Sequence, residues 1–279
     1  MVRAKTPFRA GNTQTLLIAV MTAIEEKELK TIQVDILCDV AAFCEKNGLR
    51  YFLAYGTLLG AVRHKGYIPW DDDIDIHMPR PDYERFLQTY SSDNNIAVSH
   101  ENCPAYRVAF AKVYRKGTTI REFHFKQDVF GVYIDIFPLD GFESKALAHK
   151  CGELRRYIHV KSSVFLPQMT LMRRLRLAAT KFILLPFGLP FMLRRIKEIA
   201  TRREYDSSSL VFSSYCRYAE REIFDREIFD NYTKVRFEGL EFRAPLDCDT
   251  YLRTLYGDYM TLPPADKQVS HHNSQAYWI

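Results

Sequence analysis

The sequence predicts a mixed α/β (α+β) fold in which strands and helices alternate around one sheet, followed by a helical, basic second part. In the first half, apolar residues recur at helical spacing and then in short strand-like runs that Gly and Pro interrupt. In the second half, residues 144–204 show helical patterns and many Lys and Arg side chains. The chain has 279 residues, 47% hydrophobic and 26% charged, which suffices for one large or two modest folded domains.

Charge and cysteine content narrow the class of protein. The formal net charge is +5, which favours anionic substrates or lipid head groups but is too small to indicate a nucleic-acid binder. The six cysteines are scattered, without a CxxC motif or a Cys/His cluster. This spacing disfavours a zinc site and a disulfide framework, and it predicts free thiols in a reducing cytoplasm.

The N-terminal segment is predicted to be a helix and not an export signal. Residues 16–24 are mostly apolar and follow three basic residues, which superficially resembles a short signal peptide. No small-x-small cleavage site follows, and residues 25–27 lead directly into a helical pattern.

The elements that follow are predicted in order. A helix is indicated by apolar residues at three- and four-residue steps from Leu29 to Phe43, and Asn47-Gly48 ends it. Residues 49–55 read as a strand, residues 58–64 as a turn or short helix, and residues 71–76 as a second strand that Pro79 stops. Residues 80–90 then read as a helix, and residues 108–114 and 132–137 as further strands.

The acidic second strand is the most informative feature. Residues 70–76 read Trp-Asp-Asp-Asp-Ile-Asp-Ile. In an extended backbone Asp71, Asp73 and Asp75 share one face, while the isoleucines point to the other. Three acids on one partly buried face repel one another unless a cation lies among them, and Mg²⁺ prefers such oxygen ligands. A solvated acidic turn is the alternative, which the interleaved isoleucines and the Pro-Trp entry disfavour.

Two further motifs strengthen the metal hypothesis. Gly56-Thr57-Leu58-Leu59-Gly60 is a turn at which backbone N–H groups and a hydroxyl can contact a phosphate, although a plain strand-to-helix turn would look the same. Downstream, Asp135 lies among apolar residues of a later strand, where a solvent-facing edge carboxylate is the less favoured alternative. A glycine turn, an Asp-x-Asp pair and a later acid form the layout that two-metal phosphoryl transfer needs.

The basic second part contains an apolar block at residues 182–193, flanked by Lys and Arg within residues 173–197. The block is shorter than the roughly 20 residues of a membrane-spanning helix, and Pro186 and Pro190 interrupt it. Two interpretations stay open: a hydrophobic hairpin in the core, or a monotopic element that dips into an anionic membrane surface.

Residues 51–86, YFLAYGTLLGAVRHKGYIPWDDDIDIHMPRPDYERF, resemble the signature of the LicD/fukutin family, which has the nucleotidyltransferase fold of polymerase-beta-type enzymes. DIFPLDGF (residues 135–142) and YLRTLYGDYMTLPPADKQVSHH (residues 251–272) are similar to further family blocks, whereas residues 144–240 match only in general character. The resemblance implies a nucleotidyltransferase-like core at residues 1–143, a helical basic insertion at residues 144–240, and a C-terminal block at residues 241–279 that completes the core.

The resemblance also implies an activity. Family members transfer a phosphorylated group from a cytidine diphosphate donor to a sugar hydroxyl, with phosphocholine from CDP-choline as the bacterial theme and ribitol phosphate as that of fukutin. The expected partners are therefore a CDP-alcohol and a glycan or glycolipid acceptor of lipopolysaccharide or teichoic-acid type, without nucleic acid. The expected location is cytoplasmic, at the inner face of the membrane. True nucleotidyl transfer with release of pyrophosphate, and a non-catalytic membrane-associated scaffold, are the alternatives.

Residue roles carry over by motif position. Asp73 and Asp75 would bind Mg²⁺ or Mn²⁺, with Asp135 as a third ligand or as the base for the sugar hydroxyl. Gly56 and Thr57 would hold the diphosphate. The remaining assignments are less direct. Arg63 would neutralise charge on the phosphate, and Lys112 would either reach the diphosphate or extend to solvent. Trp70 would pack in the core or contact a choline, and His271 and His272 would cover the site or have no role in it.

Overall fold

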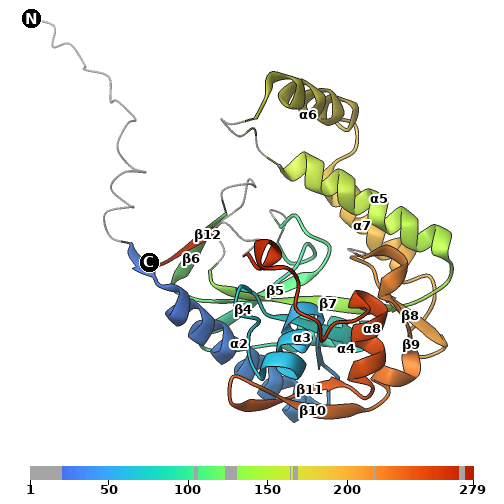
Figure 1. Cartoon of the computed structure of the whole chain (residues 1–279). Coiled ribbons are helices and arrows are strands. Elements are labelled where there is room, and N and C mark those ends of the chain that lie inside the picture. The colour runs from blue at the N-terminus through green and yellow to red at the C-terminus, as the bar shows by residue number, and fades with distance from the viewer. Residues whose placement is uncertain are drawn as a thin grey trace, which may run out of the picture.

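The computed structural model describes residues 21–103, 106–122, 131–163, 165, 169–215, 218–269 and 274–279. Across these ranges the chain forms a mixed α/β fold with seven α-helices and a central mixed sheet, as predicted (Figure 1). None of the helices described there is both long enough and apolar enough to cross a bilayer.

The central sheet positions the site. Its strands run in the order β2 (Phe52–Leu53), β3 (Asp75–Pro79), β7 (Tyr133–Gly141), β5 (Ala111–Arg115) and β4 (Asn95–Val98). Strands β3 and β7 are parallel, and the other neighbours are antiparallel. The register sets Asp75 opposite Asp135, and Lys112 opposite Asp135 on the other side. Directly opposite residues share a face of a sheet, so these three side chains form a row across it.

Three helices pack on this sheet. Helix α2 (Glu26–Asn47) contacts β7 and β5, and it ends at Gly48, whose φ of +63° suits a residue without a Cβ. Helices α3 (Tyr55–His64) and α4 (Arg80–Thr89) contact β3. The apolar face of α2, including Ile36, Leu37 and Val40, is fully buried in the main hydrophobic core. Helix α8 (Cys248–Tyr256) contacts α3, so the C-terminal part of the chain closes over the start of the core.

The helical second part has a core of its own. Helices α5 (Lys145–Ser162) and α7 (Leu189–Ala200) pack together around Cys151, Leu193 and Ile196, and α6 (Leu171–Ile183) lies beyond them. After these helices, β8 (Leu210–Ser213) pairs with the far end of β7 and β9 (Ile223–Asp225) pairs with β8. A hairpin of β10 (Tyr232–Phe237) and β11 (Leu240–Pro245) precedes α8. The three-part division drawn from the sequence stays a prediction.

The helix predicted at residues 16–24 is wrong for the part of it that the structure describes. Residues 22–24 form strand β1 (Thr22–Ile24) instead of a helix, while residues 16–20 lie outside the described residues. Strand β1 pairs with β12 (Ser274–Trp278), which also pairs with β6 (Thr118–Glu122). This small sheet joins the first and last described segments of the chain, a pairing that no local pattern reveals.

The predicted strands also begin or end elsewhere. The acidic run is a loop up to Ile74, and the strand begins only at Asp75. The strand predicted for residues 49–55 is limited to residues 52–53, because the chain turns into α3 at Tyr55. Strand β7 continues to Gly141, beyond the predicted end at residue 137, because its far end pairs with β8.

Candidate active site

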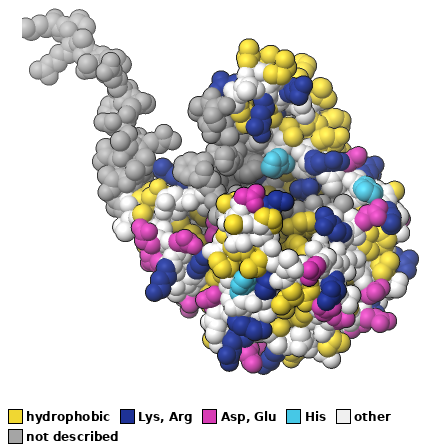
Figure 2. All heavy atoms as spheres, in the orientation of Figure 1, with side chains coloured by type: hydrophobic (Ala, Val, Ile, Leu, Met, Phe, Trp, Pro, Cys, Tyr) yellow, Lys and Arg dark blue, Asp and Glu magenta, His cyan; other side chains and the backbone are white. Residues whose placement is uncertain are grey.

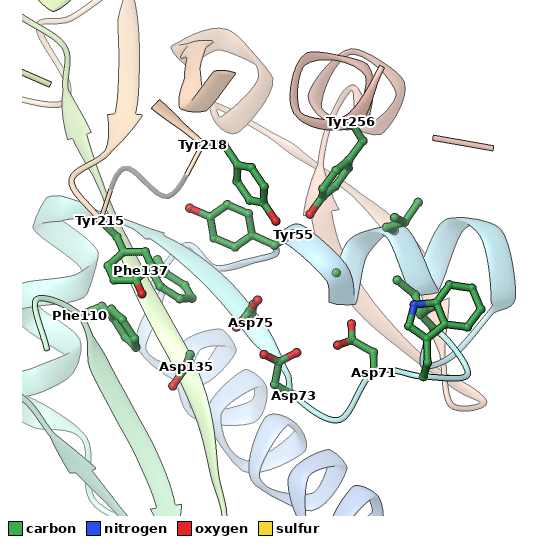
Figure 3. Close-up of a pocket in the computed structure, with 14 residues that line it drawn as sticks. Tyr55, Asp71, Asp73, Asp75, Phe110, Asp135, Phe137, Tyr215, Tyr218 and Tyr256 are labelled. Atoms are coloured by element: carbon green, nitrogen blue, oxygen red, sulfur yellow. The ribbon is translucent and has the colours of Figure 1, made fainter. Parts of the chain in front are cut away.

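A cavity of about 260 Å³ opens where α3, the acidic loop and β7 meet (Figure 3). Its lining contains four carboxylates, a group of aromatic rings, and a few other residues from α3 and the loop that follows it. The carboxylates are those of Asp71, Asp73, Asp75 and Asp135. Four of the residues predicted for the site therefore lie around one space: Gly56, Asp73, Asp75 and Asp135.

Hydrogen bonds fix the backbone that carries the acids. The Asp75 N–H donates to Thr57 Oγ1 at 2.8 Å, and the Ala54 N–H donates to the Asp75 carbonyl at 3.0 Å. The Asp135 N–H donates to the Ile74 carbonyl at 2.8 Å, which ties the acidic run to β7. Asp75 and Asp135 are each only 9% exposed. Thr57 is buried and supports Asp75 from behind; it is not part of the cavity lining.

The loop before β3 is held from α2 as well. Gln33 donates from Nε2 to the Asp72 carbonyl at 2.9 Å and to the Tyr133 carbonyl at 3.3 Å. The Tyr67 hydroxyl donates to Gln33 Oε1 at 2.9 Å. A buried glutamine thus connects the acidic loop to the first residue of β7, which keeps Asp73 close to the strand that bears Asp135.

Lys112 pairs with the third acid. Its Nζ lies 2.5 Å from Asp135 Oδ1, and the side chain is buried. The ammonium group also lies 3.3 Å from the centroid of the Tyr133 ring, close enough for a cation–π contact. Lys112 does not line the cavity. It forms an ion pair with a carboxylate that does, and this pairing offsets part of the cost of burying the two side chains.

The glycine turn forms the start of α3. A Cβ atom built on Gly56 would lie 2.5 Å from Asp71 Oδ2, so only glycine allows this carboxylate to approach the helix start so closely. The preceding residue, Tyr55, has a φ of +43°, which is unusual for a bulky side chain and marks local backbone strain. Strain of this kind gathers at functional sites, and here it lies at the cavity wall.

Arg63 lies elsewhere. It donates from Nη1 to the Tyr259 carbonyl at 2.7 Å and from Nε to His64 Nε2 at 2.9 Å, and it is not among the residues that line the cavity. Trp70 does line the cavity and also packs against the main core. His271 and His272 lie outside the described residues.

Six aromatic side chains form one side of the cavity, and we call them the aromatic wall (Figure 3): Tyr55, Phe110, Phe137, Tyr215, Tyr218 and Tyr256. Their rings contact one another in sequence, with centroids 5.2 Å apart for Tyr55 and Phe137 and 4.3 Å apart for Phe110 and Phe137. They come from α3, β7, α8 and the loops around them, so no spacing in the sequence indicates the group. The sequence indicates an aromatic site only through its many aromatic residues, 17 Tyr and 19 Phe.

A buried carboxylate lies behind the aromatic wall. Glu222 is fully buried, and it accepts hydrogen bonds from the Tyr55 hydroxyl at 3.2 Å and from the Tyr218 N–H. Burial, followed by the charge of Glu222, raises the pKa of Tyr55 well above its usual range, so this tyrosine is a neutral phenol. Electron-rich ring faces with a negative charge behind them attract a cation more strongly than the rings alone.

The acids have the donor chemistry of a Mg²⁺ or Mn²⁺ site, since carboxylate oxygens are the ligands that these ions prefer. Among the residues that the structure describes, no three His, Cys, Asp or Glu side chains are already close enough together to enclose an ion. Asp135 forms an ion pair with Lys112 and not a cluster with the other acids. The residues therefore fit a metal by type and by their shared cavity, and binding would require the carboxylates to approach one another.

The sequence was compared with known proteins. Residues 48–174 match the family model described as "LicD/FKTN/FKRP, nucleotidyltransferase domain". Over 268 residues the chain is 29% identical to the lipopolysaccharide cholinephosphotransferase LicD of Haemophilus influenzae, an alignment that covers 92% of this chain and 99% of that protein. A 37-residue stretch is 51% identical to human ribitol 5-phosphate transferase FKRP, covering 13% of this chain and 8% of that protein. An uncharacterized protein of Rickettsia typhi is 32% identical over 142 residues, or 48% of this chain and 43% of that protein.

Proposed function

We propose that this chain, which is similar to proteins of the LicD family and is an enzyme of LicD type, transfers phosphocholine from CDP-choline to a glycan hydroxyl. The acceptor would be a cell-surface glycan such as lipopolysaccharide, or its lipid-linked precursor. The reaction would depend on Mg²⁺ or Mn²⁺ and would take place at the inner face of the cytoplasmic membrane. One observation carries the proposal: a single cavity has four carboxylates in its lining and an aromatic wall backed by Glu222.

The two parts of the cavity match the two charged parts of phosphocholine. The phosphate is anionic, and a metal ion held by Asp73, Asp75 and Asp135 would supply the positive charge that binds it. The quaternary ammonium cannot donate a hydrogen bond, and aromatic faces are the surfaces that recognise such cations. Ribitol and glycerol phosphates are neutral at the distal end and would gain nothing from Glu222. The cavity therefore favours choline over a polyol.

In the transfer itself, the acceptor oxygen forms a bond to the distal phosphorus of the donor, the bond from that phosphorus to the CMP oxygen breaks, and CMP leaves. When bound, the metal would stabilise the negative charge on the phosphate oxygens. Asp73 and Asp75 would hold it, and Asp135 would complete the ligand set or accept the proton of the acceptor hydroxyl. Lys112 would position Asp135, while Gly56 lets the Asp71 carboxylate lie close to the start of α3.

The proposal is tested by calorimetric titration of CDP-choline, CDP-ribitol, CDP-glycerol and CTP into the protein, with Mg²⁺, with Mn²⁺ and with EDTA. We expect metal-dependent binding with a preference for CDP-choline. Asp75→Asn should weaken it by at least the roughly 10–100-fold typical of disturbing a metal site. Asp72→Asn is the matched control, because Asp72 lies in the same acidic run but does not line the cavity.

Three outcomes would contradict the proposal, each in a different way. Preference for CTP, with pyrophosphate as the released product, would establish nucleotidyl transfer. Absence of metal-dependent binding for every donor would favour a non-catalytic scaffold that keeps the fold. A preference for CDP-ribitol or CDP-glycerol would keep the LicD-type chemistry but reject choline and the role assigned to the aromatic wall.

A further inference from the structure

Helix α6 presents apolar side chains outward. None of its residues is buried, and Leu171 and Phe182 are each 73% exposed, with Leu175 at 57%. These three lie four and seven residues apart, which places them on one side of the helix. A surface helix of a globular protein normally turns such a stripe toward the core. In α6 the stripe faces outward, while Lys181 of the same helix contacts α5 by donating to the Lys161 carbonyl at 3.3 Å.

The exposed apolar surface continues into the turn after α6 and the first residues of α7. We call the whole set the apolar ridge: Leu171, Met172, Leu175, Phe182, Ile183, Leu185, Phe187 and Phe191. Its inner side is well anchored. Leu184, Met192 and Leu193 are buried in the core of the helical part, and Lys161 donates from Nζ to the Leu184 carbonyl at 2.8 Å. The ridge is therefore held in place by packing from beneath, while no residue that the structure describes covers its upper side.

The charges within the chain segment that carries the apolar ridge have one sign. Between Glu153 and Glu198 the sequence contains no Asp or Glu and ten Lys or Arg residues: Arg155, Arg156, Lys161, Arg173, Arg174, Arg176, Lys181, Arg194, Arg195 and Lys197. Three of these cations pair with acids outside the segment: Arg194 and Arg195 with Glu198, and Lys197 with Glu84 and Glu101. Arg173 and Arg176 are exposed on α6 itself. In Figure 2 the yellow apolar surface at the top of the molecule has dark blue side chains next to it.

The position of the apolar ridge suits contact with a large flat partner. Helix α6 lies at the outer end of the projection that α5 and α7 form, well away from the central sheet (Figure 1). A second copy of the chain would be a poor partner, because a two-fold interface through the same surface would bring two cationic surfaces together. An anionic lipid surface can take up the apolar side chains among its acyl chains and attract the nearby cations with its phosphates.

We propose that the apolar ridge is a membrane-docking surface that inserts into the interface of a bilayer containing anionic lipids. Helix α6 has 13 residues and would lie in the interface plane, with its apolar side among the acyl chains and Arg173 and Arg176 at the level of the phosphates. Docking of this kind would bring the enzyme to a lipid-linked acceptor. The inference itself depends only on the exposed side chains and charges, and it holds whichever group the cavity transfers.

The test is flotation of the full chain with two kinds of vesicle, phosphatidylcholine alone and phosphatidylcholine mixed with phosphatidylglycerol. We expect binding to the anionic vesicles only, and weaker binding at high salt, where charges are screened. The double variant Phe182→Ser/Ile183→Ser should lose roughly tenfold or more of this binding, since each side chain contributes apolar area. Arg173→Gln/Arg176→Gln should also lose roughly tenfold, because each cation near the surface contributes to attraction.

A matched control changes equally apolar side chains away from the ridge. Leu240 and Leu246, which are 44% and 54% exposed, belong to the β10–β11 hairpin and the residue after it. Leu240→Ser/Leu246→Ser should bind vesicles as the unmodified chain does. Equal binding by the ridge and control variants would overturn the proposal, and so would the discovery of a dimer in solution that the ridge variants dissociate.

The same variants separate this inference from the proposed function. Calorimetric titration with CDP-choline and Mg²⁺ should give the same affinity for the ridge variants as for the unmodified chain, because no ridge residue lines the cavity. Loss of vesicle binding with donor binding intact supports the docking surface alone. Failure of donor binding in every protein, with vesicle binding intact, would reject the phosphocholine proposal and leave the docking surface in place.

Discussion

At the scale of single residues, the site depends on side chains that face one cavity from opposite directions. Asp75 and Asp135 come from neighbouring parallel strands, whereas Tyr55 and Tyr256 come from helices that are distant in the sequence. Lys112 and Glu222 lie one step behind them and contact Asp135 and Tyr55, respectively. The charged side chains that line the cavity are all acidic, so the phosphate of a zwitterionic ligand would need a bound cation, whereas its ammonium would face the aromatic wall.

Tyr256 tests the role of the aromatic wall. Tyr256→Leu removes a ring face that lines the cavity and contacts Tyr218 edge to face at 5.8 Å. We expect CDP-choline affinity to fall by about 5–30-fold, the loss of about 1–2 kcal/mol of cation–π attraction. CDP-glycerol affinity should not change. Tyr256→Phe keeps the ring and should bind CDP-choline almost normally; an equal loss for both donors would show that the ring has only a structural role.

At the scale of elements, the acidic strand depends on the helices beside it. Thr57 of α3 and Gln33 of α2 hold the backbone on either side of Asp73 and Asp75. Helix α4 begins directly after β3, and its first residue, Arg80, donates from Nε and Nη2 to the two carboxylate oxygens of Asp140 on β7, at 2.6 and 3.0 Å. Asp140 is completely buried. This bidentate pair joins α4 to the strand that bears Asp135.

We expect Arg80→Met to reduce the free energy of unfolding by about 3–5 kcal/mol, because it leaves the Asp140 charge buried without its partner. Urea denaturation measures the change. Replacing both residues, as Arg80→Met/Asp140→Leu, should reduce the free energy of unfolding clearly less than Arg80→Met alone, since no unpaired charge is left buried. Arg253→Met, which breaks an exposed pair with Asp249 within α8, is the control and should have little effect. Similar costs for the single and double core variants would show that packing, and not the charge pair, stabilises this junction.

At the scale of the whole molecule, the cavity joins parts of the chain that are far apart. Its lining extends from Tyr55 to Tyr256, and strand β12 brings the last described residues beside the first. The helical part adds the apolar ridge at the outer end of the molecule (Figure 1). Donor binding in one place and membrane contact in another would let the enzyme hold a water-soluble donor while it meets a lipid-linked acceptor.

Because the lining comes from so much of the chain, donor binding should stabilise the entire fold. With Mg²⁺ present and CDP-choline at about 100 times its Kd, the free energy of unfolding should rise by about 2.7 kcal/mol, and the Tm by several degrees. Thermal unfolding followed by circular dichroism measures this. EDTA, or the Asp75→Asn substitution, should abolish the shift. An unchanged shift with EDTA would exclude a metal between donor and carboxylates.

Local patterns were sufficient for several features of this protein. The alternation of Asp and Ile predicted that Asp73 and Asp75 lie apart from the core, and the run of apolar residues around Asp135 predicted a buried strand. The resemblance to the LicD family rests on the same short stretches, and the family model and the alignment support it. The apolar block and its flanking basic residues could also be recognised from the sequence, because the composition of a short segment does not depend on the rest of the fold.

The sequence by itself therefore determined the fold class, the acidic run and the resemblance to the LicD family, since each depends on residues that are close together in the chain. Only the tertiary structure decided that Lys112 pairs with Asp135, that Thr57 supports Asp75 from behind, that Arg63 contacts Tyr259, and that six separate aromatic rings form one wall. It also showed which residues of the apolar block are buried, namely Leu184, Met192 and Leu193, and that no residue of α6 is buried. Such relations depend on which distant segments pack together, and a pattern confined to one segment contains no information about its partner.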